Sequence, residues 1–156
     1  MSATPTRVEL HSASEEQTKA IGRRLSKSLL PGTLVALDGD LGSGKTRFVQ
    51  GMAEGLGIAS DEVSSPTFVL CHIYAGDLTL LHVDAYRLKA LDEVPDLGIS
   101  EALDEGSIVV IEWAGRISAA LPTDFIHVQI DEIDPNTRRI VVEGHGPNSQ
   151  QILTCW

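Results

Sequence analysis

The sequence predicts an α/β fold with a mixed sheet, in which parallel and antiparallel strands are flanked by helices. Residues 34–37 form an uncharged apolar run, which is typical of a strand buried on both faces, and a glycine-rich loop and an amphipathic helix follow it. Residues 68–74 and 78–83 are two further strand-like runs. The turn between them is so short that these two strands must pair antiparallel. The sheet therefore departs from an all-parallel, doubly wound arrangement.

The loop after the first of these strands matches the phosphate-binding pattern G-x-x-x-x-G-K-[ST] at every fixed position. Its glycines allow backbone N–H groups to turn inward onto phosphates, and the N-terminus of the next helix adds free donors. Lys45 can reach the β- and γ-phosphates, and the hydroxyl of Thr46 can bind Mg²⁺. A P-loop NTPase-like fold follows. The residues expected to bind the nucleotide here are Asp40, Leu41, Gly42, Ser43, Gly44, Lys45 and Thr46.

Length, composition and charge are those of an ordinary globular protein. We expect residues 1–156 to form a single domain, with 1–6 and 146–156 loosely ordered. The net charge of −10 argues against a charge-driven grip on DNA or RNA. No apolar stretch approaches the roughly 18 residues that a membrane-spanning helix needs, and the N-terminus does not resemble a signal peptide. We therefore expect a cytoplasmic protein that contacts neither DNA nor a membrane.

The sequence predicts one strand and one helix before the central strand over residues 34–37. Apolar and charged residues alternate over residues 7–10, which favours a short strand. Ser14 and Gln17 have the spacing of a capping box, so that a helix begins there. Pro31 and Gly32 end that helix.

The rest of the chain continues the same alternation of strands and helices. Apolar residues recur every fourth position after the loop, which predicts one helix with a single apolar stripe. The remaining predicted elements are irregular short helices over 91–105, a buried strand over 107–111, a brief helix over 117–121, and a hairpin formed by 125–130 and 139–142.

Two acidic residues each follow an apolar strand, Asp84 after residues 80–83 and Glu112 after 108–111. ATP hydrolysis needs an acid to hold Mg²⁺ and a group to orient water, and in open α/β sheets such groups stand at the carboxyl ends of strands. The alternative is that either acid caps a turn. We expect Lys45, Asp84 and Glu112 to carry the chemistry.

Thr67 follows a proline in the loop after the phosphate-loop helix. Switch-type NTPases place a hydroxyl there that senses the γ-phosphate and Mg²⁺. The alternative is an ordinary threonine at the start of a strand.

The histidines and asparagines carry less information. His72, His82 and His127 lie in strand-like runs without a shared metal-ligand spacing, so that they are predicted to be packing or surface residues. A guanine-reading Asn-Lys-x-Asp motif is absent, because Asn136 and Asn148 are the only asparagines. ATP is therefore favoured over GTP.

Four segments, taken together, resemble the bacterial TsaE (YjeE) family in order and spacing. They are residues 39–46, 65–68, 82–88 and 111–113, with the sequences GDLGSGKT, SPTF, HVDAYRL and IEW. The resemblance covers about residues 12–142, nearly the whole chain. It implies a P-loop ATPase that hydrolyses ATP to support threonylcarbamoyl modification of adenosine 37 in tRNA, together with the partner proteins TsaD and TsaB.

The resemblance also implies ATP and Mg²⁺ as cofactors. It places Thr46, Asp84 and Glu112 at the metal or at the attacking water. Hydrolysis that is weak alone and stimulated by the partners is typical of such proteins. Contact with tRNA is expected only indirectly, through the complex.

The family further places the start of the first helix and a basic residue of the late hairpin near the nucleotide. In this sequence these are Ser14 and Arg138. The chain departs from the family pattern at Arg47, where a threonine is common, and at residues 114–116, where proline, an acidic residue and arginine are frequent. Two other functions remain open at this point: a small-molecule P-loop kinase, and a nucleotide-binding adaptor with little turnover.

Overall fold

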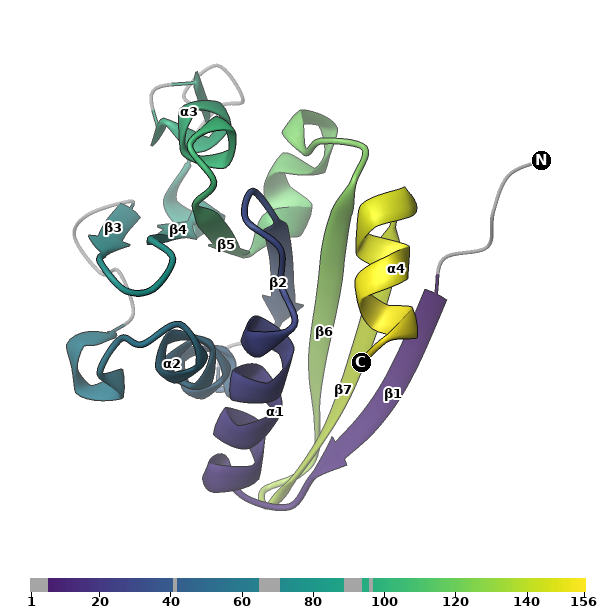
Figure 1. Ribbon diagram of the computed structural model, residues 1–156. Helices are drawn as coiled ribbons and strands as arrows, with labels where there is room; N and C mark the ends of the chain where they lie inside the picture. Colours follow the sequence, from purple (N-terminus) through teal and green to yellow (C-terminus); the bar gives the residue numbers. More distant parts are fainter. Residues whose placement is uncertain (1–5, 41, 65–70, 89–93, 96) are drawn as a thin grey trace.

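One seven-stranded sheet forms the centre of the molecule (Figure 1). The structure is a computed structural model that describes residues 6–40, 42–64, 71–88, 94–95 and 97–156. The strand order is β1-β7-β6-β2-β5-β4-β3. The strands are β1 (Thr6–Ser12), β2 (Leu34–Gly39), β3 (Cys71–Tyr74), β4 (Leu80–Asp84), β5 (Ile108–Glu112), β6 (Phe125–Asp134) and β7 (Thr137–His145).

The middle of the sheet is parallel and its two margins are antiparallel. Strand β2 pairs in parallel with β5 and β6, and β5 pairs in parallel with β4. The pairs β3–β4, β6–β7 and β1–β7 are antiparallel. Every residue of β4 and β5 is buried, which explains why apolar residues predominate in both strands. The mixed sheet predicted from the sequence is confirmed.

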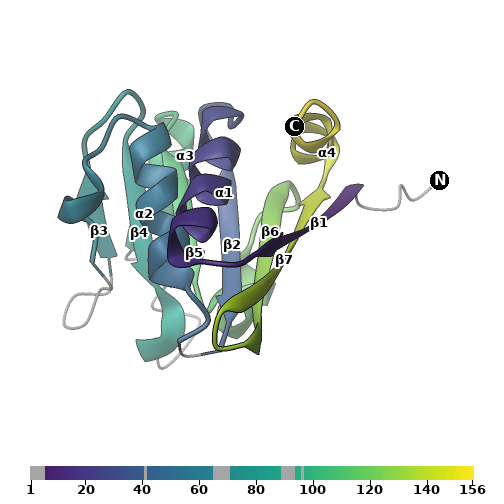
Figure 2. The same ribbon diagram turned by 90° about the horizontal axis from the view of Figure 1, so that it is seen from below.

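Helices and turns cover both faces of the sheet. The α-helices are α1 (Glu15–Lys27), α2 (Lys45–Gly55), α3 (Ile99–Asp104) and α4 (Pro147–Thr154), and the 3₁₀ turns are η1 (Ser60–Glu62), η2 (Ala85–Arg87) and η4 (Ala114–Ala120). Apolar residues of α1, α2 and α4 share one core with the sheet, whereas α3 and η4 belong to a second core on the other face. Figure 2 shows α1 and α2 side by side against the sheet.

Helices α1 and α2 touch backbone to backbone. A Cβ atom added to Gly51 would lie 1.9 Å from the carbonyl oxygen of Lys19, and one added to Gly22 would lie 2.2 Å from that of Phe48. Only glycine leaves enough room at these two positions. The start of α1 is thereby held close to the phosphate loop.

The predicted capping box at the start of α1 is present. The N–H of Gln17 donates to the Oγ of Ser14 at 3.1 Å, and the Oε1 of Gln17 accepts from the N–H of Ala13 at 2.7 Å. The second bond therefore reaches one residue further back than a standard capping box requires.

The expectation of a loosely ordered segment over residues 146–156 is wrong, because α4 occupies most of it. Ile152 and Leu153 pack into the core beneath the sheet. The carboxylate of Asp124 accepts the N–H groups of Asn148 and Ser149 at 2.8 and 3.0 Å, which satisfies donors at the helix start. This cap comes from a distant part of the chain.

Among the described residues, none of the helices has the length and apolar character that crossing a membrane would require.

Candidate nucleotide-binding site

Three parallel strands end side by side at one edge of the sheet. Gly39 ends β2, Asp84 ends β4 and Glu112 ends β5. The register pairs Asp84 with Glu112, and Leu37 near the end of β2 with the same glutamate. The two acids identified from the sequence are therefore neighbours. Glu112 lies beside the end of β2, the strand that leads into the phosphate loop, and Asp84 lies one strand further away.

The phosphate loop has the backbone conformation that its glycines permit. Gly42 and Gly44 have φ angles of 78° and 107°, in the left-handed region that side chains disfavour. Gly44 is the N-cap of α2, and no side chain in the described part of the chain caps that helix start. The first N–H groups of α2 therefore remain available to an anion. Leu41, which belongs to the predicted set, lies outside the described residues.

Lys45 is buried inside the loop, with only 6% of its surface exposed. Its Nζ donates to the carbonyl oxygens of Gly39 at 2.5 Å and Asp40 at 2.9 Å. Burial lowers the pKa of Lys45 below its usual 10.5, and nearby carboxylates, Glu112 foremost, oppose this shift. The ammonium group thus lies where phosphate oxygens could replace two backbone carbonyls.

Glu112 is almost fully buried and has a partner that the sequence did not reveal. Its Oε2 lies 2.5 Å from Nε2 of His82, whose side chain is completely buried. The sequence predicts only a packing or surface role for His82. The spacing His-x-Asp contained a clue, because residues two apart on a strand share one face, so that His82 and Asp84 both face the α2 side.

Asp84 also has a structural role. Its Oδ1 accepts the N–H of Tyr86 at 2.9 Å, so that it caps η2. Asp84 therefore has the capping role that the sequence left open, and it also lies beside Glu112.

Trp113 is a further residue of the site that the sequence reasoning did not single out. Its φ of 60° is the only positive one outside glycine in the described part of the chain. Its N–H donates to the carbonyl oxygen of Leu37 at 3.0 Å, and its ring lies 4.2 Å from Nζ of Lys45. The indole thus covers the lysine from the side of β5. Its position directly after Glu112 was the available clue.

Arg138 and Ser14 both line one pocket beside the loop. The Nε of Arg138 donates to the carbonyl oxygen of Ser43 at 2.8 Å, and its Nη2 contacts that of Gly42 at 3.4 Å. The pocket has a volume of about 430 Å³, and its lining includes Ser14, Gly42, Gly44 and Arg138. Thr67 lies outside the described residues.

Oxygen ligands for Mg²⁺ are present at this edge of the sheet. The hydroxyl of Thr46 and the carboxylates of Asp84 and Glu112 are the hard donors that Mg²⁺ prefers. No group of three or more His, Cys, Asp or Glu able to hold a metal occurs among the described residues.

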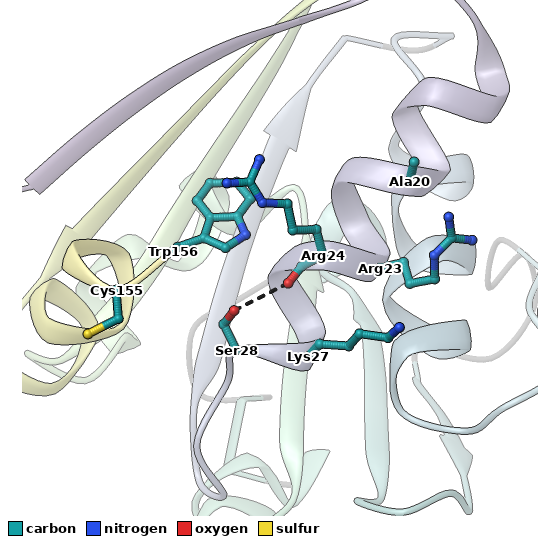
Figure 3. Close-up of a pocket in the computed structure, with 7 residues that line it drawn as sticks. All are labelled: Ala20, Arg23, Arg24, Lys27, Ser28, Cys155 and Trp156. Atoms are coloured by element: carbon teal, nitrogen blue, oxygen red, sulfur yellow. Dashed lines mark hydrogen bonds between the residues drawn. The ribbon is translucent and has the colours of Figure 1, made fainter.

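A second pocket, of about 470 Å³, lies between the end of α1 and the residues that follow α4 (Figure 3). Arg23 is paired with Glu54 at 2.9 Å, and the guanidinium of Arg24 lies 4.9 Å from the ring centre of Trp156. Basic residues in the last turn of a helix also offset the negative end of its dipole. None of the site residues predicted from the sequence lines this pocket.

A central strand that leads through a phosphate loop into a helix, with carboxylates at the neighbouring strand ends, defines a P-loop NTPase fold. The crystal structure of Bacillus subtilis YdiB has the same architecture, with a TM-score of 0.79 and 28% sequence identity over 98% of this chain and 95% of that chain. The chain belongs to the TsaE family, because the model described as "Threonylcarbamoyl adenosine biosynthesis protein TsaE" matches residues 12–140.

Several relatives carry the name tRNA threonylcarbamoyladenosine biosynthesis protein TsaE. The protein from Rickettsia conorii is 39% identical over 140 residues, 88% of this chain and 79% of that protein. The Bacillus subtilis protein is 39% identical over 132 residues, covering 84% and 82%. The Streptomyces coelicolor protein is 41% identical over 136 residues, covering 82% and 90%. The resemblance stated from the sequence motifs is confirmed, and the family role is in tRNA threonylcarbamoyladenosine biosynthesis.

Proposed function

We propose that this chain is a Mg²⁺-dependent ATPase that supports threonylcarbamoyl modification of adenosine 37 in tRNA, together with TsaD and TsaB partners. The observation that carries the proposal is the convergence of the buried Lys45 with Asp84 and Glu112 at one edge of the sheet. A phosphate loop alone would support only nucleotide binding. Two carboxylates at its side supply what hydrolysis needs in addition.

Each residue has a role in this proposal. Lys45 exchanges its bonds to backbone carbonyls for bonds to the β- and γ-phosphates, and the open N–H groups of α2 bind the same oxygens. Thr46 and Asp84 hold Mg²⁺, the latter directly or through water. When bound, Mg²⁺ neutralises charge that develops on the phosphate oxygens. Glu112 orients the attacking water, and Thr67 senses the γ-phosphate.

The nucleoside part of ATP is proposed to occupy the pocket between Ser14 and Arg138. This pocket adjoins Gly42 and Gly44, so that it continues directly from the phosphate-binding loop. The guanidinium of Arg138 bonds two carbonyl oxygens of the loop, which stabilises the loop's shape around the phosphates.

The partners follow from the family rather than from a surface on this chain. A net charge of −10 disfavours direct binding to the phosphates of tRNA, so that the chain would act on the RNA through TsaD and TsaB. A cytoplasmic location follows from that of the tRNA.

The test is ATP hydrolysis by the purified protein, alone and with TsaD and TsaB, beside the variant Glu112→Ala. We expect turnover that the partners stimulate, and a loss of about a hundredfold or more in the variant with ATP binding retained. Binding without turnover under either condition would favour a nucleotide-binding adaptor. Transfer of phosphate to an added acceptor, seen by product analysis, would favour a small-molecule kinase.

A further inference from the structure

We propose that His82 is a positioning residue, which holds the carboxylate of Glu112 in one orientation through a buried hydrogen bond. The inference rests on the proposed role of Glu112 in orienting water. It deepens that role by naming the group that fixes the glutamate before nucleotide binds.

The two side chains meet across neighbouring parallel strands. The register places His82 opposite Val110 and Asp84 opposite Glu112, so that the histidine reaches diagonally to the glutamate. The exposed fraction is 0% for the side chain of His82 and 5% for that of Glu112. The bond between them, 2.5 Å from Nε2 to Oε2, is therefore shielded from water.

The surroundings of the ring indicate which nitrogen carries the proton. Nδ1 is buried and has no hydrogen-bond partner in the described part of the chain. The tautomer with its hydrogen on Nδ1 would leave a buried donor unpaired, and its Nε2 would have no hydrogen to donate to the carboxylate. The tautomer with its hydrogen on Nε2 donates to Glu112 and leaves only an acceptor, Nδ1, unpaired.

A packing role alone does not explain a histidine at this position. Leu80 and Val110, which lie on the same face of the sheet, are apolar core residues. A leucine would fill the same space without burying an unpaired ring nitrogen, and buried unsatisfied groups are uncommon because they cost stability.

The bond engages only one of the two carboxylate oxygens. Within the described residues, Oε1 of Glu112 makes no hydrogen bond, so that this oxygen is left for water or metal. Without His82 the carboxylate could rotate about its last bond. Partners of this kind, one step away from the reacting groups, typically change activity or metal affinity by about 10–100-fold.

The first experiment compares three substitutions of His82 in the full-length protein with its partners. The amide nitrogen of His82→Gln can stand where Nε2 stands, the shorter amide of His82→Asn cannot, and His82→Leu has no donor. We expect kcat to fall about 10–100-fold in the Leu and Asn variants, and to recover largely in Gln, with ATP affinity unchanged in all three. Equal losses in Gln and Leu, or wild-type kcat in Leu, would overturn the inference.

A double-variant comparison separates positioning from general damage. If His82 acts through Glu112, then His82→Leu lowers kcat in the wild-type background but has no further effect beside Glu112→Gln. Additive losses would show a role independent of the glutamate and would overturn the inference.

A measurement without nucleotide keeps the inference separate from the proposed function. In ¹⁵N spectra of the histidine side chains of the nucleotide-free protein, we expect His82 to show a protonated Nε2 and an unprotonated Nδ1. The Nε2 proton should shift when Glu112→Gln replaces the charged acceptor. A protonated Nδ1 beside an unprotonated Nε2 would overturn the pairing, whatever the turnover of the protein. Absence of ATP turnover in the wild type would overturn the proposed function instead, while the spectra still decide the pairing.

Discussion

Helix α1 has a pocket at each end, and the cations near the two pockets differ in their environment. The pocket at its N-terminus measures about 430 Å³ and adjoins the phosphate loop that encloses Lys45. The pocket at its C-terminus measures about 470 Å³ and is lined by Arg23, Arg24 and Lys27. Volume and number of positive charges would therefore favour the second pocket as a binding site for ATP.

The surroundings of the charges favour the first pocket. Arg23 already has a carboxylate partner in Glu54, and Arg24 lies over an indole ring. Lys45 also lies against an indole ring, that of Trp113, but it is buried and its hydrogen bonds go to backbone carbonyls, which are weak partners that a phosphate can replace. A buried cation that has no directly bonded carboxylate among the described residues, beside open helix N–H groups, indicates an anion site better than exposed cations do.

The largest expected effect on ATP affinity comes from replacing Lys45, near the first pocket, compared with replacing Lys27 in the second pocket. Lys45→Ala should weaken ATP binding by about a hundredfold or more, because charge-assisted bonds to phosphate are each worth roughly 1.5–3 kcal/mol. Lys27→Ala, the matched control at the other end, should leave affinity unchanged. Titration calorimetry with ATP measures both. Wild-type affinity in Lys45→Ala would remove the distinction between the two pockets.

A smaller effect is expected at Arg138, which bonds two carbonyl oxygens of the phosphate loop. Arg138→Ala should weaken ATP binding by about tenfold, the equivalent of one net charge-assisted bond. Arg138→Lys should recover only part of the lost ATP affinity, because an ammonium lacks the planar fork of the guanidinium. The control is Arg139→Ala, whose side chain pairs with Asp131 at 3.2 Å. Equal losses in Arg139→Ala would show a general charge effect.

At the other end of α1, the expected effect concerns stability and pH. Hydrogen bonding from Lys19 lowers the pKa of Glu54 below its usual 4.5, and Arg23 adds to this. Because the folded-state pKa is the lower one, the carboxylate stabilises the fold above about pH 4.5, and this contribution is lost as the pH falls through the folded-state value. Glu54→Gln should therefore lower the free energy of unfolding by up to about 1 kcal/mol at neutral pH.

Urea unfolding of Glu54→Gln and wild type across acid pH checks this expectation. The two curves should converge as the pH falls. A difference that grows toward acid pH would contradict the assigned direction of the pKa shift.

The smallest effect is expected from Arg24→Ala. Loss of the contact with Trp156 should cost about 0.5–1 kcal/mol of stability, as exposed cation–π pairs do, and ATP affinity should not change. Thermal unfolding and the same calorimetric titration measure the two quantities, with Arg24→Lys as the variant that keeps the charge. Weakened ATP binding in Arg24→Ala would mean that the two ends of α1 do not act separately.

The features that could be predicted from the sequence are those that local patterns determine. The phosphate loop, the capping box at Ser14 and the placement of Asp84 and Glu112 at strand ends all follow from neighbours in the chain. The antiparallel pair β3–β4 follows from a short turn. The order of the seven strands does not, because it depends on which surfaces pack together.

The features that escaped prediction depend on contacts between distant residues. Helix α4 is capped by Asp124, far before its first turn, so that a Gly- and Asn-containing stretch resembled a loose tail. The bond between His82 and Glu112 depends on the register of two strands 30 residues apart. The position of Arg138 beside Gly42 followed only from the family resemblance, because nothing near Arg138 in the sequence indicates it.

The glycine contact between α1 and α2 has a mechanical consequence. At Gly22 and Gly51 no side chain separates the two backbones, so that no rotamer change can absorb a displacement of one helix against the other. A displacement of α1 would therefore be passed on to α2, whose first turn carries Lys45 and Thr46. The two ends of α1 differ in their chemistry, yet they belong to one helix that is packed tightly against α2.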